Sequence, residues 1–80
     1  MSEQTITIVI CEVEHKGVKS NYFLSDFTGT LSRRIADAVV FKQHLVAEFF
    51  ATKVEQLYPG VKVLGRTRQM AFEELMELSF

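Results

Sequence analysis

The chain has 80 residues, a formal net charge of −1, seven phenylalanines and an apolar content of 48%. This hydrophobic content excludes an intrinsically disordered chain, and the near-neutral charge leaves no global field that would attract nucleic acid or anionic lipid. The length predicts one domain, residues 1–80, with a small core.

Cysteine usage and the first residues predict a cytoplasmic protein. Cys11 is the only cysteine, so no internal disulfide can form, as is typical of a reducing compartment. The first residues lack the basic segment of a signal peptide. No apolar run approaches the roughly 20 residues of a membrane span. We therefore expect no membrane partner.

The first third of the chain predicts a β-hairpin and a turn. Residues 5–13 (TITIVICEV) carry apolar side chains on both faces, which is typical of a central strand. Gly17 can adopt the positive φ of a tight hairpin turn. Residues 18–24 (VKSNYFL) predict the returning strand, and residues 26–29 (DFTG) predict another turn.

The middle of the chain predicts a main helix. Residues 33–38 predict a short helical turn, and residues 39–41 (VVF) predict an extended step because of their β character. The main helix is expected over residues 42–57. One continuous helix over residues 32–57 remains open, since no Gly or Pro interrupts it. Pro59 disfavours helical geometry at the residue before it and ends the helix.

The last part predicts a third strand and a short helix. Residues 61–64 (VKVL) predict the strand, and apolar residues at helical spacing predict a C-terminal helix from about Arg68. The expected fold is α+β, with the connectivity β-β-α-β-α. It has a three-stranded antiparallel-type sheet in the order 2-1-3, with the main helix on one face and the short helix at the end.

Two apolar stripes on the main helix give the clearest indication of function. One stripe is expected to face the sheet, and the other lies about 100° away on the helical wheel. The first stripe comprises Val46, Phe50, Val54 and Leu57, and the second comprises Phe41, Leu45 and Phe49. The second stripe needs a further partner, which is either the C-terminal helix or another chain.

A further apolar surface competes for the same short helix. The second face of the central strand, with Val9, Cys11 and Val13, has no obvious cover. One helix of about three turns cannot cover both surfaces, so we expect an interface with a partner. The expected interface residues are Phe41, Leu45, Phe49, Phe72, Leu75 and Met76.

Few residues are typical of catalysis or metal binding. Cys11 lies mid-strand, His15 lies in a turn and His44 lies early in the main helix, which is not the spacing of metal ligands. No glycine-rich phosphate loop is present. We expect no catalytic residue, no metal and no cofactor, and therefore a protein that is not an enzyme. A site built between subunits is the remaining enzymatic alternative.

Basic residues provide an alternative function as a small nucleic-acid-binding protein. If they converge in the fold, they would contact phosphates. Tyr22 and Phe23 point to opposite faces of their strand and form no stacking pair, so nucleic acid is not the expected partner. The candidate phosphate-binding residues are Arg33, Arg34, Lys62, Arg66 and Arg68.

About half of the chain consists of the run YFLSDFTGTLSRRIADAVVFKQHLVAEFFATKVEQLYPGVKVLG. This run resembles the small, mostly uncharacterised accessory proteins of phages and prophages. In this run an aromatic strand is followed by a turn, a step containing Ala38 and Phe41, a helix and a short strand. The resemblance implies no catalytic residue and implies a binding or regulatory role. We therefore expect a protein–protein interaction module that forms a homodimer or docks on a larger protein.

Overall fold

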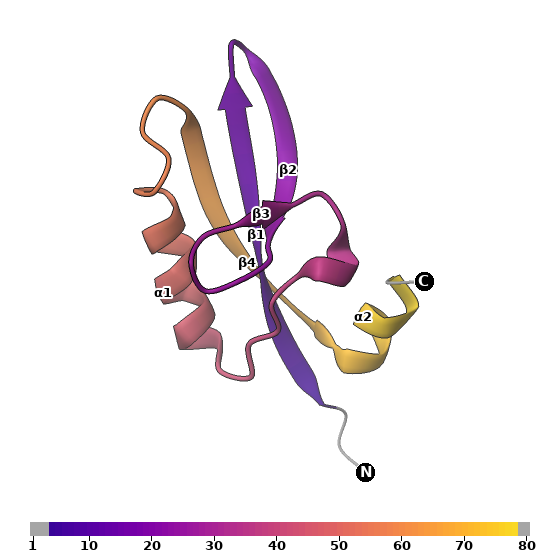
Figure 1. Ribbon diagram of the computed structural model, residues 1–80. Helices are drawn as coiled ribbons and strands as arrows, with labels where there is room; N and C mark the ends of the chain where they lie inside the picture. The colour runs from indigo at the N-terminus through magenta and orange to yellow at the C-terminus, as the bar shows by residue number, and fades with distance from the viewer. Residues whose placement is uncertain (1–3, 79–80) are drawn as a thin grey trace.

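The computed structural model describes residues 4–78 and contains a four-stranded antiparallel sheet with a helix on each side (Figure 1). The strands lie in the order β3-β2-β1-β4. The elements in chain order are β1 Thr5–His15, β2 Val18–Leu24, β3 Leu31–Ser32, the 3-10 turn η1 Ile35–Asp37, α1 His44–Val54, β4 Lys62–Ala71 and α2 Phe72–Leu78. The predicted α+β class, antiparallel sheet and two helices are confirmed.

The long strands follow the predicted order, with β1 in the centre. β4 pairs with β1 along nearly its whole length, from Thr5↔Ala71 to Glu14↔Lys62. The prediction of three strands is wrong, because residues 31–32 form the additional strand β3 beside the end of β2. A two-residue strand carries too little alternation to be recognised in a sequence.

The start of the C-terminal helix differs from the prediction. β4 continues to Ala71 and α2 begins at Phe72, rather than at about Arg68. Met70 is buried beside its strand partner Ile6, so pairing with β1 overrides the helical preference of this segment. Tertiary contacts commonly decide such cases against local propensity.

The break before the main helix is confirmed. After η1 the chain runs in extended form, and α1 begins at His44. Phe41 exchanges two backbone hydrogen bonds of 2.8 Å with Thr7 of β1. This isolated bridge fixes the extended step against the sheet and buries the Phe41 side chain, which is 4% exposed.

α1 covers the face of β1 that carries Val9 and Cys11, so the expectation that this face has no cover is wrong. Its buried residues are Ala47, Ala51 and Val54, so the prediction that Val46 and Leu57 face the core is wrong. Those two side chains are 40% and 43% exposed. The short alanine side chains let the helix lie close to the strands, and this contact sets the rotation of the helix about its axis.

The opposite face of the sheet is covered by α2 and η1 (Figure 1). Leu75 of α2 packs in a cluster with Ile6 and Ile8 of β1 and Met70 of β4. The C-terminal helix therefore packs on its own chain. With α1 on one side and α2 on the other, β1 is buried on both faces over its first half.

Candidate functional site

The outward face of α1 carries an exposed apolar surface. Leu45 is 77% exposed and Phe49, one turn further along, is 60% exposed. Lys53 continues this face, with its Nζ atom 5.8 Å from the centroid of the Phe49 ring. We call Leu45, Val46 and Phe49 the α1 outer surface.

The six residues expected at an interface do not form one surface. Phe41 and Leu75 are buried within the chain itself, so they offer no area to a partner. Phe72 and Met76 are partly exposed on α2, which lies across the sheet from α1. Of the six residues, only Leu45 and Phe49 are exposed on the same face of one helix.

The adjacent phenylalanines of α1 have different surroundings. The Phe50 ring lies 5.5 Å from the ring of Phe41 and 5.5 Å from that of Phe27, centroid to centroid. Phe27 belongs to the β2–β3 loop, so Phe50 joins α1 to this loop. Phe49 contacts the edge of Phe50 and otherwise faces outward.

An aspartate holds the β2–β3 loop in shape. Oδ1 of Asp26 accepts hydrogen bonds from the backbone N–H groups of Thr28 (2.9 Å) and Thr30 (3.1 Å), and from the Thr28 hydroxyl (2.7 Å). These bonds, led by the one from the Thr28 hydroxyl, hold the pKa of Asp26 well below its usual range. The loop is further tied to the chain beyond α1 by the Tyr58 hydroxyl, which donates to the carbonyl of Gly29.

The outer edge of β4 has free backbone groups. Thr7 directs its N–H and C=O toward Phe41, on the β2 side of β1. Because these directions alternate along a strand, the even-numbered residues of β1 bond to β4. The even-numbered residues of β4 form the matching hydrogen bonds with β1. The backbone N–H and C=O groups of the odd-numbered residues of β4 point away from β1, toward the outer edge. Within residues 4–78, the N–H and C=O groups of Thr67 and Gln69 have no hydrogen-bond partner.

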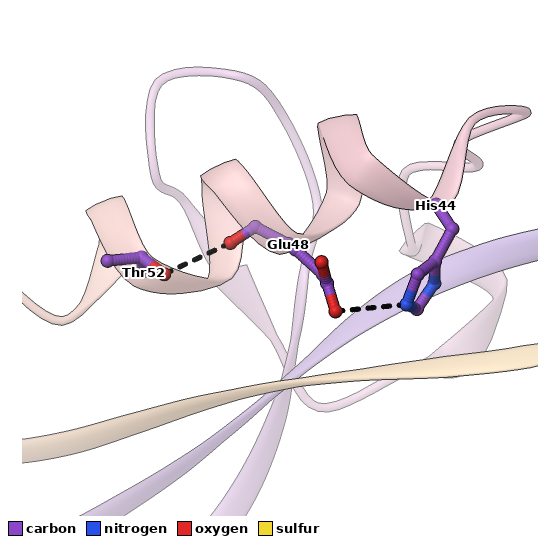
Figure 2. A network of polar contacts seen from close by, with 3 residues as sticks. All are labelled: His44, Glu48 and Thr52. Carbon is purple, nitrogen blue, oxygen red and sulfur yellow. Dashed lines mark hydrogen bonds and ion pairs between the residues drawn. The ribbon is translucent and has the colours of Figure 1, made fainter.

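A groove of about 380 Å³ runs between this edge and α1. Glu48, Ala51 and Thr52 line it from the helix, and Gly65, Arg66 and Thr67 line it from the strand. Figure 2 shows His44 and Glu48 pointing from α1 toward the strands, with His44 Nε2 3.1 Å from Glu48 Oε1. The Thr52 hydroxyl donates to the Glu48 carbonyl at 3.2 Å (Figure 2). This groove was missed in the sequence analysis. Polar residues recur every four positions on α1, and this spacing was a signal for it.

The basic residues lie in two separate places. Arg33 stacks over the Tyr22 ring at 5.6 Å, on the β2 side of the sheet. Lys62, Arg66 and Arg68 alternate along β4, at the opposite edge and on the face away from α1. Arg34 is exposed beside η1. The five residues therefore do not converge.

The buried cysteine is not activated. Burial, and secondarily the nearby Glu55 carboxylate, raise the pKa of the Cys11 thiol to about 11. Reactive cysteines need the opposite shift and access to solvent. Over residues 4–78, no three His, Cys, Asp or Glu side chains group as metal ligands would, and no helix has the length and hydropathy needed to cross a bilayer.

Comparison with protein-family models, with curated proteins and with solved structures finds no match to this chain. The two surfaces described above are therefore the basis for assigning a function.

Proposed function

We propose that the chain is a non-enzymatic interaction module that forms a homodimer through the α1 outer surface. The observation that carries the proposal is the joint exposure of Leu45 and Phe49 on one helix face. Burying a Leu or Phe side chain contributes roughly 1.5–3 kcal/mol. A twofold contact buries each of them twice, which helps to offset the cost of association.

This role agrees with the resemblance to small accessory proteins of phages and prophages, which implies a binding or regulatory role. A cytoplasmic setting suits it, because the one cysteine of the chain is buried as a free thiol. In this proposal α1 supplies the dimer contact, while α2 stays packed on its own chain through Leu75.

Light scattering on the wild-type chain and two variants tests the dimer. We expect a dimer at about 100 μM, and a folded monomer for Phe49→Asp, because an unpaired carboxylate is strongly disfavoured in an apolar contact. Val18→Asp is the matched control, since Val18 is also exposed but lies in the β-hairpin. A wild-type monomer, or a Phe49→Asp dimer, would overturn the proposal.

The alternative function, nucleic-acid binding, retains only Lys62, Arg66 and Arg68, which share one face of β4. Glu12 and Glu14 of β1 lie beside them on the same face, so the local field is partly neutralised. If the chain binds nucleic acid, we expect a gel shift of the nucleic acid at low salt, and binding that weakens steeply as salt is added. The absence of any shift at low salt would remove it.

A further inference from the structure

We propose that the outer edge of β4 binds an extended, acidic segment of a partner protein by strand addition. The incoming strand would bond to the free backbone groups of Thr67 and Gln69 and place acidic side chains opposite Arg66 and Arg68. This site is separate from the α1 outer surface, so it does not depend on the proposed dimer.

The backbone of β4 is suitable for such a partner. An added strand gains affinity from main-chain hydrogen bonds and specificity from alternate side chains. Thr67 and Gln69 point their N–H and C=O groups to the same open side, two residues apart, as one ladder requires. The register with β1 is continuous from Thr5↔Ala71 to Glu14↔Lys62, so no bulge twists this edge away.

Apart from the charges of Arg66 and Arg68, the usual protections of an edge strand are missing at this point. Native edges are commonly very short, covered, or interrupted by proline or a bulge. At the other side of the sheet, β3 is only two residues long. On β4, the outward N–H of Gly65 is occupied by Glu55 Oε2 at 2.8 Å. Residues 67–69 contain no proline, and no group within residues 4–78 covers them in this way.

Charge favours a different protein over a second copy of this chain. Antiparallel pairing of β4 with itself about Thr67 would place Arg66 opposite Arg68 of the other copy, twice on the same face. Registers centred on Arg66 or Arg68 would place that arginine opposite itself. Like charges directly opposite each other destabilise a strand pair, whereas opposite charges stabilise it.

The same geometry defines the partner sequence. Both arginines are exposed and have no ion-pair partner within residues 4–78, so two acidic residues spaced by one would complement them. The residue between these two faces the groove beside Glu48 and Thr52, where a basic or small polar side chain fits. The partner segment therefore alternates acidic, basic and acidic residues in extended form.

The probe is the capped peptide Thr-Val-Glu-Lys-Glu-Val-Thr, with binding measured by calorimetry. We expect saturable binding to the wild-type chain and about a tenfold loss of affinity for the double variant Arg66→Glu/Arg68→Glu. The same peptide with lysines in place of both glutamates should not bind. Absence of binding by the acidic peptide would overturn the proposal.

Thr67→Pro tests the role of the backbone, with Thr67→Val as the matched control. Proline is tolerated on an edge strand where the N–H faces solvent, and it removes the outward donor. We expect Thr67→Pro to lose peptide binding and Thr67→Val to keep it. Equal binding by the two variants would overturn strand addition. If Thr67→Pro does not fold, a backbone N-methylated peptide replaces it, and undiminished binding of that peptide has the same meaning.

Two further outcomes separate this site from other functions. If a single-stranded oligonucleotide binds, and binding is lost in the arginine double variant but kept in Thr67→Pro, the arginines contact phosphates and the proposal falls. If Thr67→Pro dissociates a wild-type dimer while Phe49→Asp does not, β4 pairs with itself. That result overturns both proposals. If the wild-type chain is a monomer and binds the peptide, only the dimer proposal is overturned.

Discussion

Gly65 of β4 lies directly against Ala51 of α1, so closely that a Cβ atom on Gly65 would overlap the carbonyl oxygen of Ala51. The backbones of helix and strand are therefore in contact at this point. Glu55, one turn after Ala51, fixes the same contact by accepting the Gly65 N–H at 2.8 Å. The position of α1 on the sheet depends on the absence of a side chain at Gly65.

Gly65→Ala should lower the free energy of unfolding by about 3 kcal/mol, because the overlap is with backbone and only a shift of the helix relieves it. Urea unfolding measures the loss. Gly60→Ala is the control: Gly60 has open space around it and a φ of 94°, so it should lose only about 1–2 kcal/mol from backbone strain. Equal losses at the two sites would contradict a tight contact at Gly65.

Phe41→Ala should cost about 3–5 kcal/mol, because Phe41 is a core residue that packs on Phe50 and Phe27. Phe49→Ala, measured at a concentration where the chain is monomeric, should change stability by less than about 0.5 kcal/mol. Chemical denaturation compares the two variants. A large loss for Phe49→Ala in the monomer would mean that its exposed ring supports the fold.

Asp26 should make stability depend on acid. Its pKa in the folded chain is lowered, chiefly by the Thr28 hydroxyl, so its contribution is complete above the unfolded pKa of about 3.9. The contribution is lost as the pH falls from there through the folded pKa. Asp26→Asn should therefore flatten the fall in melting temperature below about pH 4. An unchanged acid profile would contradict this role.

Cys11 should be inert in the folded protein. Because its thiol is buried and its pKa is raised to about 11, a disulfide reagent at neutral pH should react only as fast as the chain unfolds. Reaction should become fast in guanidinium. Rapid reaction of the native chain at a rate independent of stability would show that the thiol is accessible.

Local patterns in the sequence were sufficient for the hairpin and for the break before α1. Gly17 marks the turn, and the apolar residues on both faces around Val9 mark a central strand. The extent of β4 depended on contacts distant in sequence. Its pairing with β1 keeps residues up to Ala71 extended, where the local pattern favours helix. The rotation of α1 likewise depended on how closely Ala47 and Ala51 approach the sheet.

The candidate surfaces were predicted in part. The spacing of Leu45 and Phe49 marked a second apolar stripe, and both side chains are exposed. The same stripe included Phe41, which is buried because of its backbone bridge to Thr7. The spacing of apolar residues along the sequence cannot predict that bridge. The predicted order 2-1-3 placed the third strand at an edge of the sheet, as observed. Its predicted length, residues 61–64, stopped short of Thr67 and Gln69, because only the distant pairing with β1 keeps those residues extended.

The central position of β1 governs the order in which the chain can acquire its structure. Strand partners such as Thr5 and Ala71 come from nearly opposite ends of the described chain. Forming the β1–β4 ladder therefore requires closing a long loop, and the entropy cost of this closure precedes the stabilising contacts. Such nonlocal pairing makes folding slow compared with a helical bundle of this size. Until residues 62–71 arrive, β1 has one unpaired edge and an uncovered row of isoleucines. A nascent chain is therefore most exposed to aggregation before residues 62–71 have been synthesised.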